Sequence, residues 1–239
     1  MPTFRHGKHT AVFINGTNMS AFLNSASSTM AIETAETTTF GDQDKTYITG
    51  LSDGTVSMSG FFDSTAGASD AVLSGMIATE DNAVSIFPEG NTITRPATVV
   101  NGQMTAYDIS SPVGDVVALS AEVQADGGLF YGFDLVGADV RTSTGNTASQ
   151  DNAAGTTGGV AVNLHIHANT HDGTTIVKVQ HSADDATWVD LVTFSTVGAA
   201  TTAGENIAIS GTVNRYLRAS YTLAGSTGSV SSAIALARR

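Results

Sequence analysis

The six histidines are the residues of this chain whose spacing most resembles a metal site. His165 and His167 lie two apart in an alternating segment, so both should point to one face of a strand. His171 and His181 follow nearby, and imidazole nitrogens bind divalent metals such as zinc. The alternative is that they occupy the solvent face of a strand whose other face is core. Because no carboxylate is placed to support such ligands, we expect neither a bound metal nor a cofactor.

Catalytic chemistry lacks a clear setting in this sequence. Serine is abundant, but none lies in the strand–turn–helix context that a hydrolase nucleophile requires. The glycine pairs at 127–128 and 158–159 precede neither a lysine nor a helix start, so they predict turns rather than a phosphate loop. We therefore expect no enzymatic activity. Several carboxylates fall in turns, where they ordinarily accept backbone hydrogen bonds: Asp42, Asp44, Asp53, Asp184 and Asp185.

Two groups of aromatic residues could form a platform for carbohydrate. Aromatic residues at alternating strand positions are more often core, but a lectin-like role for the second half stays open as an alternative function. The groups are Phe130, Tyr131 and Phe133, and Trp188, Phe194, Tyr216 and Tyr221.

The elements that would position these side chains are almost all strands, which predicts an all-β fold. Residues 55–62 alternate between apolar and small polar side chains, as a half-buried strand requires. Turns are expected at Asn15-Gly16 and at 126–128. One flanking helix is predicted from Ser69, with Ser69-Asp70 as its cap and apolar residues following at helical spacing.

Residues 39–53 are predicted to form a long loop between two strands. This stretch far exceeds a hairpin loop of about 2–5 residues. It also carries Phe40, Tyr47, Ile48 and Leu51, which a free loop would expose to water. Long loops of this kind usually pack against something, and another copy of the chain is a natural candidate.

Composition favours a protein that contacts copies of itself. Charged residues make up 13% of the 239 residues, and hydrophobic residues 41%. A surface with so few charges is poorly protected against self-association. The net charge of −12 argues against a protein that grips phosphate backbones. There is no cysteine, which excludes disulfides and thiolate metal sites.

A change of composition at residues 142–159 divides the chain. This stretch is rich in Thr, Ser, Gly and Asn without apolar periodicity, so we expect a flexible linker. It would separate a first domain, 1–141, from a second domain, 160–239, which has the several short strands of an Ig-like β-sandwich. We expect this second domain to be an outer appendage that is dispensable for assembly.

The first domain resembles the major tail tube proteins of long-tailed bacteriophages, of the siphovirus type and particularly from actinobacterial phages. The likeness rests on ordered blocks rather than on one motif. These blocks are residues 4–8, 11–16, 20–25, 33–41, 50–54 and 60–63. The second domain resembles β-sandwich modules appended to phage virion proteins, at residues 179–188 and 215–219.

The resemblance implies a tail-tube-type β-sandwich or barrel with one flanking helix, and six copies per ring. Stacked rings would form the tube through which DNA is ejected without specific binding. The implied partners are further copies of the chain and the tail terminator, tape measure and baseplate proteins. The implied location is the virion tail, after assembly in the host cytoplasm and without a membrane. Residues 39–53 become the expected ring-stacking element, through Phe40, Tyr47, Ile48 and Leu51. A capsid or baseplate decoration protein and a carbohydrate-binding β-sandwich remain as alternatives.

Overall fold

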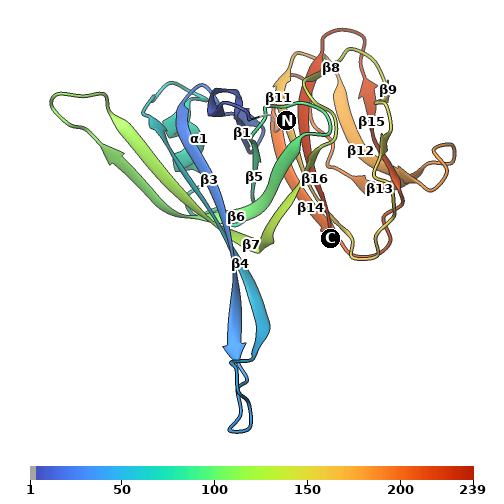
Figure 1. Cartoon of the computed structure of the whole chain (residues 1–239). Coiled ribbons are helices and arrows are strands. Elements are labelled where there is room, and N and C mark those ends of the chain that lie inside the picture. Colours follow the sequence, from blue (N-terminus) through green and yellow to red (C-terminus); the bar gives the residue numbers. More distant parts are fainter. Residues whose placement is uncertain (1–3) are drawn as a thin grey trace.

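The structure, a computed structural model, describes residues 4–239 and consists almost entirely of antiparallel strands (Figure 1). The all-β prediction is confirmed. An 11-stranded sheet contains the order β14-β11-β16-β7-β6-β5-β1-β2, with β3, β4 and β8 branching from it. A second, five-stranded sheet has the order β10-β15-β12-β13, with β9 paired to β15.

The first module, residues 4–141, is built on two long hairpins that project from a small core (Figure 1). One hairpin joins β3 to β4, and the other joins β6 to β7. Its elements are η1 (Gly7–His9), β1 (Ala11–Ile14), β2 (Thr17–Asn18), β3 (Leu23–Glu36), β4 (Tyr47–Phe61), α1 (Ser69–Gly75), β5 (Asn82–Phe87), β6 (Pro96–Ser110), β7 (Ala118–Asp134) and β8 (Asp139–Arg141).

The helix prediction is confirmed by α1, but its predicted cap is wrong. The N-cap residue is Ala68, which makes no side-chain capping bond. The Ser69 hydroxyl instead accepts a hydrogen bond from the Asp63 amide at 2.9 Å and donates one to the Phe61 carbonyl at 2.8 Å. Ser69 therefore fastens the helix to the end of β4. Leu73 and Met76 are fully buried in the first module's core, beneath β4 and β7.

The turn predicted at residues 126–128 is wrong, because this stretch lies inside the 17-residue strand β7. Gly127 and Gly128 have φ angles of +75° and +108°, which glycine adopts at little cost, so the strand bends here without ending. β7 consequently reaches both modules. It pairs with β4 at residues 118–124 and with β16 through Phe133 and Asp134.

The second module is a two-layer sandwich whose core contains the apolar face of β11. Val160, Val162, Leu164 and Ile166 are all at most 1% exposed. One layer contains β11, β14 and β16, and the other contains β12, β13 and β15. The strands are β11 (Val160–Asn169), β12 (Thr174–Ser182), β13 (Val189–Thr193), β14 (Ala203–Ile209), β15 (Tyr216–Ala224) and β16 (Val230–Arg238).

The prediction of a structureless linker at 142–159 is wrong. Two short strands in this stretch, β9 (Gly145–Asn146) and β10 (Gln150–Asp151), both pair with β15. Thr156 bridges to Val213, and Asp151 forms an ion pair with Arg215 at 2.5 Å. The composition is that of a flexible segment, but the unpaired edge of β15 supplies hydrogen-bond partners. The proposed domain boundaries themselves stay a prediction.

The two modules meet along a buried seam. It is formed by Phe13, Phe87, Ala97 and Val99 from the first module, and by Ala161, Ala233, Ala235 and Ala237 from the second. The chain also approaches itself closely at the Asn15-Gly16 turn, where a Cβ on Gly16 would lie 2.4 Å from the Ala203 carbonyl oxygen. The second module is thus docked on the first rather than tethered to it.

Candidate functional site

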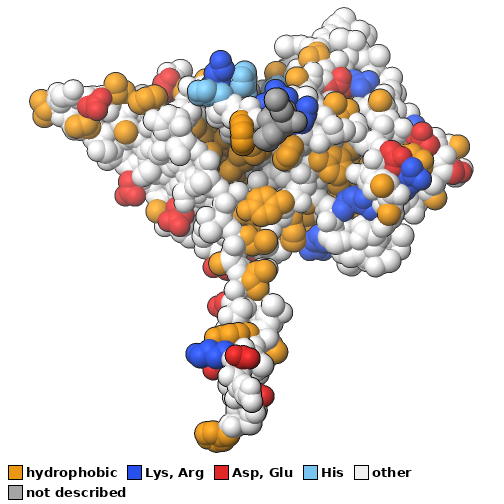
Figure 2. All heavy atoms as spheres, viewed as in Figure 1, with side chains coloured by type: hydrophobic (Ala, Val, Ile, Leu, Met, Phe, Trp, Pro, Cys, Tyr) orange, Lys and Arg blue, Asp and Glu red, His pale blue; other side chains and the backbone are white. Residues whose placement is uncertain are grey.

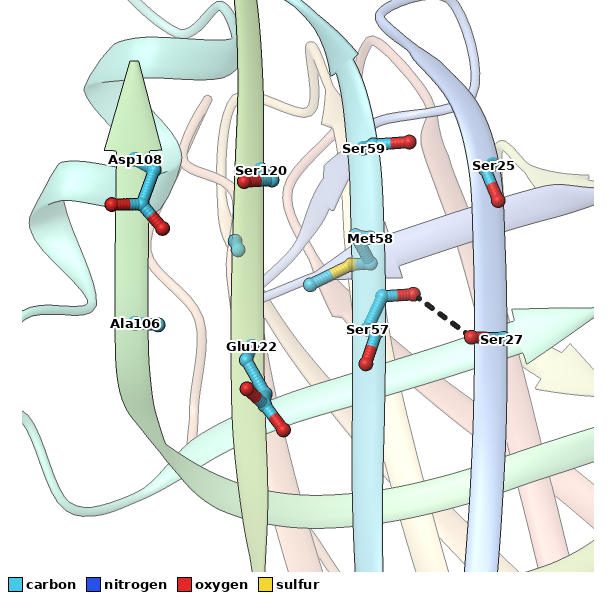
Figure 3. Close-up of a pocket in the computed structure, with 10 residues that line it drawn as sticks. Ser25, Ser27, Ser57, Met58, Ser59, Ala106, Asp108, Ser120 and Glu122 are labelled. Carbon is cyan, nitrogen blue, oxygen red and sulfur yellow. Dashed lines mark hydrogen bonds between the residues drawn. The ribbon is translucent and has the colours of Figure 1, made fainter. Parts of the chain in front are cut away.

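The most distinctive surface is one bare face of a four-stranded sheet (Figure 3). The sheet consists of β3, β4, residues 118–124 of β7 and residues 103–110 of β6. We call its exposed side the polar face. A shallow groove of about 290 Å³ runs across it. Its polar lining residues are Ser25, Ser27, Ser57, Ser59, Asp108, Ser120 and Glu122.

The other side of the same sheet is apolar and buried. Val56, Met58, Ala121 and Val123 alternate with the residues of the polar face and are at most 4% exposed. They pack in the core that includes Leu73 of α1. The chain therefore covers one face of this sheet with its own core and leaves the other face open, lined by hydroxyl groups and carboxylates.

Both edges of the four-stranded sheet are open. Within the described chain, β3 has β4 as its only strand partner, and residues 103–110 of β6 pair only with β7. Proteins usually protect such edges with lysine or proline. Neither residue occurs in β3 or in the open stretch of β6, although β3 has bulges near Ser25 and Thr34. This sheet can therefore accept a further strand on either side.

The four residues predicted to act in ring stacking lie on one projecting element, but it is not a free loop. Strand β4 already begins at Tyr47, which pairs with Glu36, and Ile48 pairs with Ala35. The long loop predicted at 39–53 is wrong in this respect, because only residues 37–46 connect the strands. The exposed fractions are 113% for Phe40, 54% for Tyr47, 59% for Ile48 and 79% for Leu51.

Local hydrogen bonds shape the end of this hairpin. Asp42 accepts a bond from the Thr39 amide at 2.7 Å and another from its hydroxyl at 3.0 Å. These bonds lower the pKa of Asp42. Lys45 forms an ion pair with Glu36 across the hairpin at 3.1 Å. The tip is thus ordered by its own contacts and presents its apolar side chains to solvent.

The projection of a second tip, between β6 and β7, was not predicted from the sequence. The turn between β6 and β7 carries Val113, which is fully exposed, and Val116, which is 60% exposed. Ile109, next to last in β6, is 49% exposed. Serine, proline and glycine around Val113 predict an ordinary surface turn. The sequence signal for this tip is that alternating apolar residues in β6 and β7 continue toward the turn, further than the core of the first module extends.

The histidines do not share a solvent-facing surface, so that interpretation is wrong. His165 is fully buried at the seam, where Nε2 lies 2.9 Å from the Ser85 hydroxyl and Nδ1 accepts a bond from the Gly16 amide at 3.3 Å. Burial lowers its pKa to about 3. His167 is half-buried and, like His165, packs against Phe13.

A further polar residue of this region, Asn163, is also fully buried at the seam. Its amide nitrogen donates to the Val84 and Val100 carbonyls and to the Ser85 hydroxyl, at 2.8 to 3.0 Å. The polar side of β11 is therefore directed at the first module. Among residues 4–239, no cluster of three or more His, Asp or Glu could hold a metal ion.

The aromatic residues of the second group do not share one exposed surface. Tyr221 and Phe194 are at most 2% exposed and belong to the second module's core. Trp188 is covered by the Arg218 guanidinium, 4.1 Å from the ring centroid. Tyr131, at 57% exposure, lies on the other module.

One serine has the spacing of a hydrolase nucleophile, in Gly50-Leu51-Ser52-Asp53-Gly54. Ser52 lies in the middle of β4, paired with Ile32 on the exposed hairpin. A nucleophile elbow needs a sharp turn into a helix, which this strand does not provide. None of the helices in the described part of the chain is long and apolar enough to span a membrane.

Comparison with known proteins gives only weak structural likeness. No protein-family model matches the sequence, and no curated protein does. A chain in the virion of a native gene transfer agent particle matches with a TM-score of 0.44 and 14% identity, over 54% of this chain and 98% of that one. A chain in the tail of an empty gene transfer agent particle with C6 symmetry matches with a TM-score of 0.43 and 15% identity, over 53% and 97%. At these scores the likeness does not establish a shared fold.

Proposed function

We propose that this chain is a structural subunit of a phage tail tube. Copies join edge to edge into six-membered rings, and the rings stack into a hollow tube through which DNA is ejected. The observation that carries the proposal is the four-stranded sheet with one buried face, one bare polar face and two open edges. Such a sheet is complete only when other strands continue it.

Edge pairing between different surfaces accounts for a ring. If the open edge of β3 pairs with residues 103–110 of β6 in the next copy, the contact is heterologous, and repeating it closes a ring when the rotation allows. Closure pairs both open edges of this four-stranded sheet, which is how barrels avoid aggregation. The sequence resemblance to tail tube proteins independently points to the same arrangement.

The polar face then lines the channel. Its serines offer small hydroxyl groups, and Asp108 and Glu122 add negative charge without any lysine or arginine among the groove-lining residues. A wall of this kind repels DNA phosphates, so the genome passes without being held. The face of the sheet that packs on α1 remains in the wall of the tube.

The projecting β3–β4 hairpin supplies the contact between rings. Burying Phe40, Tyr47, Ile48 and Leu51 against a neighbouring ring contributes on the order of 1.5–3 kcal/mol each. Because strand pairing already orders the hairpin, the entropic cost of docking is smaller than for a free loop of the same length. The tail terminator, tape measure and baseplate proteins remain the proposed further partners, and the virion tail the proposed location.

Negative-stain microscopy of the untagged protein over a concentration series tests the proposal. We expect rings or tubes with a central channel. A monodisperse monomer at every concentration would overturn it. A monomer that also binds glycans would favour the carbohydrate-binding alternative, and solid lattices without a channel would favour a decoration protein of the capsid or baseplate.

A further inference from the structure

The β3–β4 hairpin has chemically different surfaces at its two ends. Its tip lies far from the body of the molecule, whereas the start of β3 lies beside the N-terminal segment (Figure 1). The 14 residues of β3 span about 45 Å at ~3.3 Å per residue. A head-to-tail neighbour would therefore bring the tip of one copy to the β3 start of another.

The tip is acidic as well as apolar. Residues 33–53 contain five acidic residues and one basic residue. The acidic residues are Glu33, Glu36, Asp42, Asp44 and Asp53. The basic residue, Lys45, is already paired with Glu36. Phe40 is fully exposed. Acidic side chains occur along the projecting hairpin, which ends in a hydrophobic group (Figure 2).

The opposite end is basic and hollowed. A groove of about 560 Å³ lies at the start of β3, lined in part by His6, Lys8, Leu23 and Asn24. A basic side chain and histidine side chains lie together near the N-terminal segment (Figure 2). Arg5 is nearby in the chain and lies 3.7 Å from Glu89, which Arg95 also approaches at 3.2 Å. The groove lining therefore combines apolar atoms with one positive charge, that of Lys8, and contains no carboxylate.

We propose that the groove lined by His6, Lys8 and Leu23 receives the hairpin tip of a second copy of this chain. Phe40 enters the groove, and Asp42 and Asp44 face Lys8 and His6. This inference rests on the proposed tube function and names the surface on which the stacking hairpin docks. The contact is heterologous, so each copy donates one tip and accepts another, and the stack grows in one direction.

Engineered cysteines test the contact directly, because the native chain has none. Asp44 and Lys8 make no side-chain hydrogen bond within the described chain, so both can be replaced with little local damage. The variant carrying Asp44→Cys and Lys8→Cys should give a ladder of disulfide-linked oligomers on mild oxidation. The matched control carries Asp44→Cys and Glu80→Cys, the latter exposed and outside the groove, and should stay monomeric on a denaturing gel.

Charge reversal gives a second, independent readout. Asp44→Lys or Lys8→Asp alone should raise the critical concentration for tube formation about tenfold, because like charges then face each other at every contact. The swap that combines both should restore it to near the native value. Glu80→Lys, a matched reversal elsewhere, should leave it unchanged.

The outcomes separate this inference from the function on which it rests. Suppose that the native chain forms tubes, but the Asp44/Lys8 cysteine pair gives no ladder and the charge swap gives no rescue. This result would refute docking of the tip in the groove and would leave the tube function unaffected. A native chain that never forms rings or tubes would overturn both.

Discussion

Strands β3 and β11 are both long, but the chain covers both faces of β11 and leaves β3 exposed. β11 is covered on both sides, by its own sandwich and by the first module, and seven consecutive residues from Val160 are buried. β3 is 14 residues long and has no buried residue. Alternation predicts which side chains share a face, but what covers that face depends on partners far away in the sequence or in another copy.

The seam and the polar face make this contrast testable. The seam is buried by contacts within one chain, whereas the polar face is exposed in the single chain. Substitutions at the seam should change folding stability, whereas substitutions on the four-stranded sheet and its hairpin should change assembly. The predictions below begin with the largest expected effect on folding and end with a variant that should change mainly assembly.

Ending the chain after Arg141 should have the largest effect. It would uncover Phe13, Phe87 and Val99, which the second module buries. Exposing three such side chains costs on the order of 5 kcal/mol, which is comparable with the whole stability of many domains. We expect insoluble protein or loss of a cooperative melting transition by circular dichroism. The second module is therefore no longer expected to be dispensable. If the protein ending at Arg141 were soluble and formed tubes, the second module would be dispensable after all.

Asn163→Leu should cost about 2–3 kcal/mol, because it removes a buried donor from the Val84 and Val100 carbonyls. Chemical denaturation would measure the change.

Ser85→Ala and Ser57→Ala form a matched pair. Ser85 is fully buried at the seam and should lose about 1 kcal/mol. Ser57 lies on the polar face and should change by less than about 0.5 kcal/mol. Equal effects at the two serines would contradict the contrast.

The pH dependence of stability should reveal His165. Its folded pKa of about 3 is below the ordinary value of 6.5, so between these values the unfolded chain binds a proton that the folded chain does not. Stability is therefore fully present above pH 6.5 and falls by about 1 kcal/mol per pH unit as the pH drops toward 3. Denaturation of the native chain and of His165→Gln between pH 7 and 4 should show a steeper loss for the native chain.

Asp134 should act in the opposite direction. Burial raises its pKa from 3.8 to about 6, despite bonds from the Val136 and Gly137 amides. The folded chain thus holds this proton more tightly, and its contribution to stability is lost as the pH rises from about 4 to 6. Asp134→Asn should be more stable relative to the native chain at pH 7 than at pH 4. A gap that does not depend on pH would contradict the burial argument.

The sequence predicted those features that depend on residues close together in the chain, and missed those that depend on distant strands. The all-β class, the helix at 69–75 and the Asn15-Gly16 turn follow from short-range pattern and turn chemistry. The covered face of β11 did not follow, because His165 and Asn163 look like solvent-facing residues until β5 and β6 are placed against them. The pairing of residues 142–159 also depended on a distant partner, since β15 supplies it.

The candidate site was predicted in part for the same reason. The apolar residues at 40, 47, 48 and 51 were recognisable as unusual in a polar stretch. Their placement on a paired hairpin was not, because β3 continues through Thr-rich sequence with little apolar signal. The polar face combines serines from three strands with Asp108 of β6 and Glu122 of β7, so only the sheet register brings it together.

A small effect on folding and a large effect on assembly are expected from the triple variant Tyr47→Ala, Ile48→Ala and Leu51→Ala. All three side chains are more than half exposed, so stability should change by about 1 kcal/mol or less. The variant should keep its circular dichroism spectrum but fail to form long tubes. Val189→Ala, which removes an apolar side chain of similar exposure from the second module, is the control and should assemble normally. Normal tubes from the triple variant would refute the stacking role.

The most direct test of the tube architecture is cryo-electron microscopy of the assembled protein at a resolution that separates strands. In the proposed tube, β3 of each copy should lie about 4.8 Å from residues 103–110 of β6 in its neighbour. Ser25, Ser57 and Glu122 should face a central channel. An assembly in which β3 stays open to solvent, or in which the polar face points outward, would contradict the proposed tube.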